Sequence, residues 1–338
     1  MLVTSSLKTV LIPTAVALGN FDGVHRGHQR VIQPVLASTP EESFSRSPAL
    51  SLLPKNERIY ATVVTFNPHP QEFFTGQTRM LLTPPVEKVR QMRSLGVDQL
   101  VLLPFDRQLA ELSPAEFVEK ILVQHLQARR ISIGEDFHFG KARSGTAADL
   151  SAIAATYGIA LTVVPLQTSD GERISSSCIR EALQQGDLQR ANQLLGRSYS
   201  LTGIVISGQQ LGRTIGFPTA NLQLPPEKFL PRNGVYCVKV LIQKPTVDWE
   251  LDIGDWQEPC SVSHPIFGVM NIGCRPTVDG INSTVEVHLL DWSGDLYGET
   301  LTVGIEQFLR PEQKFASLDD LKAQIEADAN AARAFLGN

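Results

Sequence analysis

The sequence predicts two domains of different class: an α/β domain with a parallel sheet and flanking helices over residues 1–185, then an antiparallel β-barrel with a C-terminal helix over 186–338. Three observations predict this division. A chain of 338 residues with 42% hydrophobic content can bury two cores of ordinary size. Up to about residue 196, apolar strand-like runs alternate with helical patterns. Beyond it, strand-like runs succeed one another between Gly, Asn and Asp turns.

The alternation in the first half predicts the parallel sheet, because strands separated by helices usually pair in parallel. In chain order the predicted elements are strands over 14–18, 61–66 and 99–105, with helices after Gly27, near 85–95 and near 114–127. Ser113 is expected to cap the last of these helices, since a proline and a glutamate follow it at capping-box spacing. Gly96 and Gly158 are typical of helix C-terminal ends.

Two segments show neither the periodicity of a helix nor that of a strand. Residues 38–58 are rich in Ser, Pro and charge, which predicts an exposed insertion. The segment 245–265 is longer than a usual connection between barrel strands, which predicts a second insertion. Pro34 falls inside the first helix, where it removes a backbone hydrogen bond, so we expect a kink or an early end there.

The second half predicts the barrel through its apolar, β-branched runs. These runs are LTGIVISG (201–208), VYCVKVLI (235–242), IFGVMNIG (266–273), TVEVHLLDW (284–292) and LTVGIEQFL (301–309). Helical periodicity returns over 317–336, with Ser317 as the expected N-cap, and this helix should pack on the barrel.

Composition excludes several classes of protein. A formal net charge of −5 argues against sequence-independent nucleic-acid binding, which usually requires a basic surface. No stretch approaches the roughly 18 apolar residues that a membrane span requires. The four cysteines are scattered, without a C-x-x-C pair, which predicts reduced thiols and a cytoplasmic protein. The apolar N-terminal segment runs into the motif described next, so we do not expect a cleaved signal.

The most informative segment is GNFDGVHRGH, residues 19–28, which follows an apolar strand and opens a helix. A helix N-terminus offers unpaired N–H groups and partial positive charge, and Gly19, Gly23 and Gly27 let an anion approach the backbone. His25 and His28 share a helix face and can both donate to a polyphosphate. The spacing differs from the P-loop and from the dinucleotide fingerprint. The alternative is a glycine-rich turn carrying two surface histidines.

A second motif, GRTIGFPTANL over 212–222, combines glycines with the oxygen donors Thr219 and Asn221. Together the two motifs resemble the bacterial bifunctional riboflavin kinase/FMN adenylyltransferase (FAD synthetase) family, over nearly the whole chain. The resemblance implies a Rossmann-like nucleotidyltransferase domain followed by a riboflavin kinase barrel. It also implies two Mg²⁺-dependent reactions: riboflavin and ATP give FMN, and FMN and ATP give FAD and pyrophosphate.

For the adenylyltransferase half, the resemblance implies that His25, His28 and Arg180 are catalytic. It implies that ATP and its phosphates are bound by Gly19, Phe21, Asp22, Gly23, Gly27, Ser176 and Ser177. It implies that the flavin and nucleotide are bound by Asn67, Pro68, His69, Pro70, Asp106, Gly134, Asp136, Phe137, Phe139 and Gly140. Read without the resemblance, the serines form a plain helix cap, 67–70 a proline-stiffened loop, and Asp106 part of a surface turn. Ser177 replaces the threonine usual in the family.

For the kinase half, the resemblance implies that Thr219 and Asn221 hold Mg²⁺. It implies that the phosphates are bound by Arg213, Gly216, Pro218, Thr219 and Asn221. Glu286 alternates with valines along a strand, so it faces opposite them, and the family's matching Glu is the general base. A solvated Glu is the alternative. Arg310 is expected near the flavin or nucleotide.

Two rival functions remain open at this stage. H-x-G-H alone does not name the acceptor, so another small phosphate ester is one alternative, although the kinase motif argues against it. A flavin sensor without turnover is the other, and the substitution Glu286→Gln separates it from an enzyme. A homo-oligomer is compatible with the sequence.

Overall fold

The computed structural model describes residues 1–36, 58–169, 171–208, 212, 215–243, 254–255, 265–277 and 280–337. Contacts divide the chain into two compact units, Met1–Ile174 with Asp248–Gln257 and Ser175–Val247 with Glu258–Asn338. The second unit therefore begins eleven residues before the boundary predicted at 185/186, and that boundary stays a prediction. Arg213 and most of both predicted insertions lie outside the described residues.

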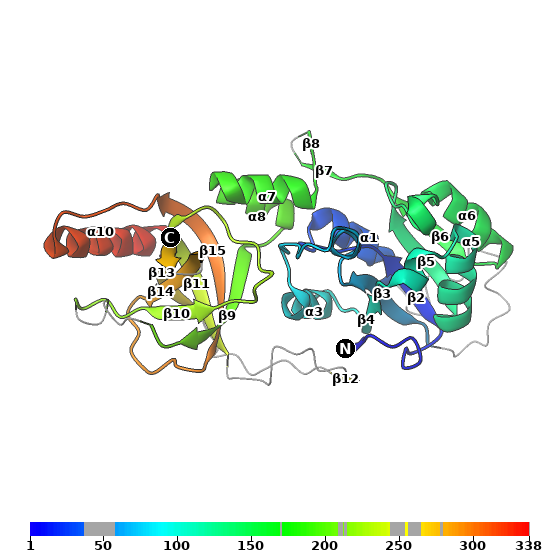
Figure 1. The fold of residues 1–338 in the computed structure, drawn as a ribbon, viewed down its shortest axis with the longest axis horizontal. Coiled ribbons are helices and arrows are strands. Elements are labelled where there is room, and N and C mark those ends of the chain that lie inside the picture. Colours follow the sequence, from blue (N-terminus) through cyan, green and yellow to red (C-terminus); the bar gives the residue numbers. More distant parts are fainter. Residues whose placement is uncertain are drawn as a thin grey trace. The chain divides into compact units, whose positions relative to one another are not determined.

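The first unit is built on a sheet whose described strands have the order β12-β1-β4-β3-β2-β5-β6. Its strands are β1 (Leu2–Thr4), β2 (Thr14–Leu18), β3 (Tyr60–Asn67), β4 (Gln99–Pro104), β5 (Ala128–Gly134), β6 (Ala160–Val164) and β12 (Gly254–Asp255). All neighbours pair in parallel except β12, which runs antiparallel to β1. The predicted parallel α/β architecture is confirmed, and Figure 1 shows its flanking helices.

Helices and short turns connect these strands. They are α1 (Arg26–Leu36), α2 (Pro70–Thr75), α3 (Pro85–Ser94), α4 (Arg107–Ala110), α5 (Pro114–Glu116), the π-helix η2 (Phe117–His125), the 3-10 turn η3 (Lys141–Arg143) and α6 (Ala147–Thr156). A small hairpin follows, formed by β7 (Thr168–Ser169) and β8 (Glu172–Arg173). The Ser113 capping box is confirmed, and Gly96 and Gly158 adopt left-handed backbone after α3 and α6 as predicted. The helix with Pro34 runs to Leu36.

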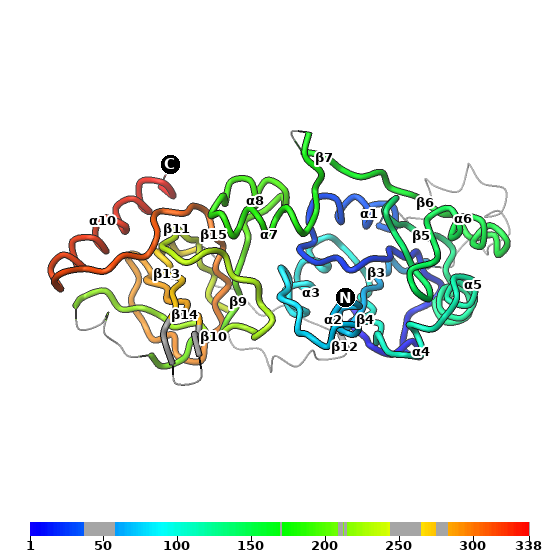
Figure 2. The backbone as a smooth tube through the Cα atoms, turned by 45° about the horizontal axis from the view of Figure 1, so that its top comes forward, coloured from blue at the N-terminus to red at the C-terminus, as the bar shows by residue number. Residues whose placement is uncertain are grey.

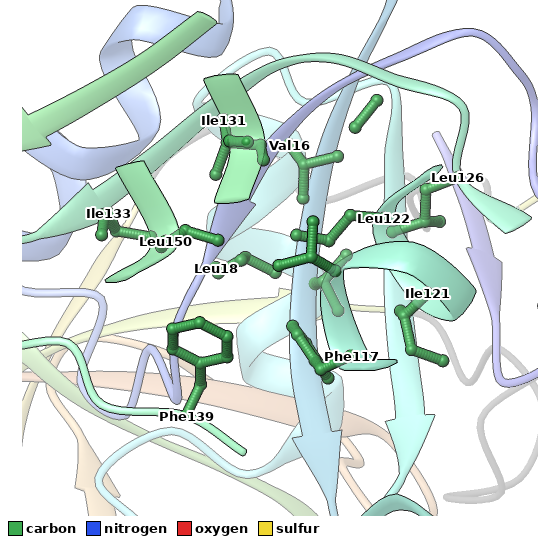
Figure 3. Close-up of a cluster of buried hydrophobic side chains, with 14 of the residues drawn as sticks. Val16, Leu18, Phe117, Ile121, Leu122, Leu126, Ile131, Ile133, Phe139 and Leu150 are labelled. Atoms are coloured by element: carbon green, nitrogen blue, oxygen red, sulfur yellow. The ribbon is translucent and has the colours of Figure 1, made fainter. Parts of the chain in front are cut away.

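Side chains alternate along β2 and enter two separate cores. Val16 and Leu18 pack with residues of η2 and α6, among them Leu122 and Leu150 (Figure 3). Ala15 and Ala17 belong to the other core, with α1 and α3. Both faces of the sheet are therefore covered, which explains why its central strands read as continuous apolar runs.

The second unit contains the predicted closed antiparallel barrel, with the strand order β10-β14-β13-β11-β15-β9. Its strands are β9 (Tyr199–Ile206), β10 (Ala220–Gln223), β11 (Gly234–Gln243), β13 (Ile266–Thr277), β14 (Gly280–Leu289) and β15 (Thr300–Arg310). Two helices precede it, α7 (Ser176–Gln185) and α8 (Leu188–Leu195), and α10 (Leu318–Leu336) follows it. Ser317 caps α10 as predicted, and α10 packs beside β11 and β13 (Figure 2). Among the described residues, no helix combines the length and apolar character needed to cross a bilayer.

Candidate active sites

The turn between β2 and α1 has an unusual backbone. Phe21 and Val24 adopt positive φ angles of 48° and 44° although neither is glycine, and Gly23 has φ 90°. For residues other than glycine such conformations cost about 1–3 kcal/mol each and persist only where surrounding contacts hold them. Here the N–H of Gly23 donates to Thr83 Oγ1 at 2.8 Å, and the N–H of Thr83 donates to Asp22 Oδ1 at 3.2 Å. The turn is therefore held by the segment that leads into α3.

The two predicted histidines lie together at the start of α1. Their rings stack with centroids 3.6 Å apart and an interplanar angle of 14°. The N–H of His28 donates to His25 Nδ1 at 3.2 Å, so His25 caps the helix, and in the neutral ring its proton sits on Nε2. A side chain at Gly27 would put its Cβ 3.2 Å from the His25 ring, so the glycine leaves room for this arrangement. The pair therefore places two stacked imidazole rings at a helix N-terminus.

An aromatic cavity of about 430 Å³ lies at the carboxyl end of the sheet. Six phenylalanines line it: Phe66, Phe74, Phe105, Phe117, Phe137 and Phe139. Figure 3 shows Phe117 and Phe139 among the core side chains, and their ring centroids are 5.6 Å apart. The rings of Phe137 and Phe139 stack at 5.7 Å. A cavity of this size and lining suits a flat, largely apolar ring system.

The structure brings several of the predicted binding residues to this cavity. His69, Pro70, Phe137, Phe139, Gly140 and Gly19 all line it. Asn67 ends β3 and is joined to Pro68 by a cis peptide bond, and His69 caps α2 by accepting from the N–H of Gln71 at 3.1 Å. The proline-stiffened loop of residues 67–70 therefore contributes His69 and Pro70 to the cavity wall.

Two predicted carboxylates are engaged elsewhere. Asp106 caps α4, its Oδ1 accepting from the N–H of Leu109 at 2.8 Å, and the neighbouring Phe105 lines the cavity instead. Asp136 forms an ion pair with Arg173 of β8, and both side chains are about half exposed. The sequence reasoning did not single out Arg173. Its place one residue before the ISSSCIR motif is the signal that could have found it.

Ser176, Ser177 and Arg180 lie on α7, in the second unit. Ser175, rather than either predicted serine, is the N-cap, accepting from the N–H of Cys178 at 3.2 Å. Arg180 donates to the Ser176 carbonyl at 3.3 Å, and its guanidinium lies 5.6 Å from the Phe229 ring centroid. Their role at the ATP phosphates stays a prediction.

In the barrel, three polar residues stand directly opposite one another on neighbouring strands. The register pairs Glu286 of β14 with Asn221 of β10 on one side and with Asn271 of β13 on the other. Directly paired residues share a sheet face, so these side chains form one polar row. Val285 and Val287 are buried on the opposite face, as the alternation predicted. Thr219 Oγ1 donates to Glu286 Oε2 at 3.4 Å, which brings a predicted metal ligand next to the predicted base.

Two further predicted residues, Gly216 and Pro218, lie in the segment that leads into β10. Gly216 has φ 92°, and the Pro218 carbonyl lies 2.8 Å from His288 Nδ1. A second cavity, of about 630 Å³, is lined by Pro218 and Thr219 together with Trp292 and residues up to Tyr297. Thr219 therefore borders both this cavity and the polar row.

Arg310 is bound within the protein. Its Nε contacts both carboxylate oxygens of Asp328 at 3.0 and 3.1 Å, and its Nη2 donates to Asp328 at 2.7 Å. The remaining Nη1 donates to the Pro311 carbonyl at 3.2 Å. The pair joins the end of β15 to α10, and Arg310 lines neither of the cavities described above. Its predicted contact with flavin or nucleotide stays a prediction.

Taken together, the two units define a class of protein. In an open parallel sheet, ligands bind at the carboxyl ends of the strands, and the helix N-terminus that carries the two histidines is a place where phosphate groups bind. The barrel places Thr219 beside a row of Asn and Glu side chains, which are oxygen-bearing groups of the kind found in phosphoryl-transfer sites. The chain thus combines two phosphate-handling transferase domains.

Comparison with known proteins agrees with this class. The FAD synthetase family model matches residues 7–178, and the riboflavin kinase model matches residues 195–336. The Escherichia coli K12 protein called bifunctional riboflavin kinase/FMN adenylyltransferase is 40% identical over 323 residues, covering 95% of this chain and 92% of that protein. The Bacillus subtilis protein of the same name is 33% identical, with 98% and 95% covered. The chain belongs to the bifunctional riboflavin kinase/FMN adenylyltransferase family.

The fold also matches a solved structure over its full length. A crystal structure described as a macrolide-efflux protein from Streptococcus pneumoniae is 30% identical, with a TM-score of 0.78 and 98% of both chains covered. Since that structure covers both units, its chain has the same two-part architecture.

Proposed function

We propose that the chain phosphorylates riboflavin with ATP to give FMN and ADP, and then transfers the AMP moiety of a second ATP to FMN, giving FAD and pyrophosphate. The observation that carries this proposal is the presence of two separate phosphate-handling sets, the stacked histidines of the first unit and the Thr219–Glu286 pair of the second. Membership in the family names the substrates.

In the adenylyl transfer, the chain's contribution is positioning and charge stabilisation. The aromatic cavity would hold the flavin ring while the FMN phosphate attacks the α-phosphorus of ATP and pyrophosphate leaves. His25 and His28 would donate to the phosphate oxygens on which negative charge builds. Their helix N-terminus adds partial positive charge at the same place. No covalent enzyme intermediate is required.

In the kinase reaction, Glu286 would accept the proton of the riboflavin 5′-hydroxyl as the γ-phosphoryl group is transferred. The hydrogen bond from Thr219 supports this role, because it orients the carboxylate beside the proposed phosphate site. The neutral side chain of Asn221, opposite Glu286 in the register, completes the polar group.

Thr219 and Asn221 are the residues that would hold Mg²⁺, which neutralises phosphate charge when bound. Among the described residues, no group of three or more His, Cys, Asp or Glu could hold a metal ion. That fits Mg²⁺, which usually takes few protein ligands and completes its shell with phosphate oxygens and water.

The thiols of Cys178, Cys237 and Cys274 are free, which supports the proposed reducing, cytoplasmic setting.

The test is to incubate the protein with riboflavin, ATP and MgCl₂ and to follow riboflavin, FMN and FAD by chromatography. We expect FMN and then FAD. Glu286→Gln should abolish FMN formation while FAD formation from added FMN continues, and His28→Asn should do the reverse. Glu326→Gln, at an exposed site on α10, is the matched control for the first substitution. A protein that binds flavin but forms neither product would be a sensor, and the proposal would be wrong.

A further inference from the structure

Lys88 is buried directly beneath the turn of residues 19–25. It lies on α3 and is only 7% exposed. Its Nζ donates to the carbonyl oxygen of Asn20 at 2.8 Å and lies 3.4 Å from Thr65 Oγ1. Thr65 Oγ1 in turn donates to the same carbonyl at 3.0 Å. A lysine from a distant helix and a threonine from β3 thus converge on one peptide group of the turn.

Burying this ammonium group is costly. Desolvation lowers the pKa of Lys88 to about 8, and the negative charge of Asp22 opposes that shift. Buried charges are rare unless they are paired, and an apolar side chain of similar volume would usually be at least as stable. The free-energy cost of burying Lys88 indicates that its positive charge has a functional role at this position.

The carboxylate of Asp22 explains why a positive charge is buried at Lys88. Asp22 is 3% exposed and lies within the turn that would receive the ATP phosphates. A carboxylate there orients the Thr83 N–H, as the 3.2 Å contact shows, but its charge would repel a polyphosphate. The buried Lys88 ammonium group interacts electrostatically with this carboxylate and offsets part of that repulsion. Two charges inside a protein interact more strongly than they would in water.

We propose that Lys88 is a positioning residue for adenylyl transfer: its ammonium group holds the Asn20 carbonyl in place and balances the Asp22 charge, so that the turn accepts the triphosphate of ATP. This inference rests on the proposed function and specifies how the same site tolerates an internal carboxylate. It needs no contact between Lys88 and substrate, because the residue acts through Asn20 and Asp22.

The main variant is Lys88→Met, which keeps the length of the side chain and removes the charge. We expect kcat/KM for ATP in FAD formation to fall by roughly 10- to 100-fold, the range that a misplaced or unbalanced site produces. KM for FMN should stay within about twofold, because Lys88 does not line the aromatic cavity. Lys120→Met is the matched control, since Lys120 is half exposed and pairs with the half-exposed Glu116.

A rescue experiment separates this role from general loss of structure. Asp22→Asn keeps an oxygen to accept from the Thr83 N–H and removes the unbalanced charge. The double variant Lys88→Met/Asp22→Asn should therefore recover at least about fivefold of the lost kcat/KM for ATP. Lys88→Gln, which retains donors without the charge, should behave like Lys88→Met. A Lys88→Gln enzyme at the wild-type rate, or a double variant no better than Lys88→Met, would overturn the proposal.

Each preparation is also assayed for riboflavin phosphorylation, which reports on the barrel unit and should remain within about twofold of wild type in every variant. The unchanged KM for FMN reports that the first unit, which carries the substitutions, is folded. If wild-type protein forms no FAD from FMN and ATP, the proposed function fails. If it forms FAD and Lys88→Met does so equally well, only the inference about Lys88 fails.

Discussion

The ion pair between Arg310 and Asp328 allows a quantitative test of what Arg310 does. Arg310 side-chain exposure is 18% and that of Asp328 is 7%, and Asp328 receives both Nε and Nη2. Removing one member of such a buried pair leaves the other charge uncompensated, at a cost of about 3–5 kcal/mol. Arg310→Met keeps the packing of the aliphatic stem and should therefore weaken the attachment of α10 to the barrel by about 3 kcal/mol.

The assay is amide hydrogen exchange along α10, because the helix is expected to detach before the barrel unfolds. A loss of about 3 kcal/mol makes exchange through local opening roughly a hundredfold faster. Arg310→Met/Asp328→Leu removes both charges and should recover most of the protection. Arg333→Met, on the same helix as Asp328, is the matched control, because the ion pair of Arg333 with Asp291 is exposed and should matter little.

The kinetic outcome decides between the two roles of Arg310. If the residue only joins β15 to α10, KM for riboflavin and for ATP stays within about twofold in the double variant. Unchanged hydrogen exchange together with a tenfold rise in either KM would refute the structural reasoning and would make Arg310 a ligand-binding residue, as the family resemblance implies.

Three further predictions follow from buried or crowded groups. The folded-state pKa of Lys88, about 8, lies below its ordinary value of 10.5. The unfolded chain therefore binds the extra proton between these values, so stability should rise by up to about 3 kcal/mol from pH 8 to 10.5. Denaturation of Lys88→Met should lack this rise, and identical pH curves for the two proteins would contradict the assignment. In Gly145→Ala the new Cβ would lie 2.8 Å from the Phe139 ring, so this ring must move. KM for FMN should therefore rise about tenfold, while riboflavin phosphorylation is unaffected. An unchanged KM for FMN would argue against this cavity as the flavin site. Burial raises the pKa of the Cys237 thiol to about 11. Iodoacetamide at pH 8 should therefore modify the exposed Cys274 and react with Cys237 only after unfolding. Labelling of Cys237 in the native protein would contradict this prediction.

Much of the architecture was readable from local pattern. The apolar run at 14–18, the glycines and histidines after it, and the caps at Ser113 and Ser317 all act within a few residues of one another. Such signals survive in any tertiary context, because helix caps and strand alternation depend on neighbouring backbone groups. The same alternation placed Glu286 opposite its flanking valines, and the structure confirms it.

Other features depended on which segments the fold brings together. The sequence around residue 22 does not predict that Thr83 and Lys88 hold the turn. Their contacts with the turn follow from the strand order β4-β3-β2 and from the packing of α3. The aromatic cavity likewise collects phenylalanines from separate connections at one sheet edge. Arg310 looks like a binding residue in its motif, yet its partner Asp328 lies on a helix 18 residues further along. Composition and periodicity specify what each segment becomes, whereas the partner of a buried charge is set by long-range packing that no local pattern encodes.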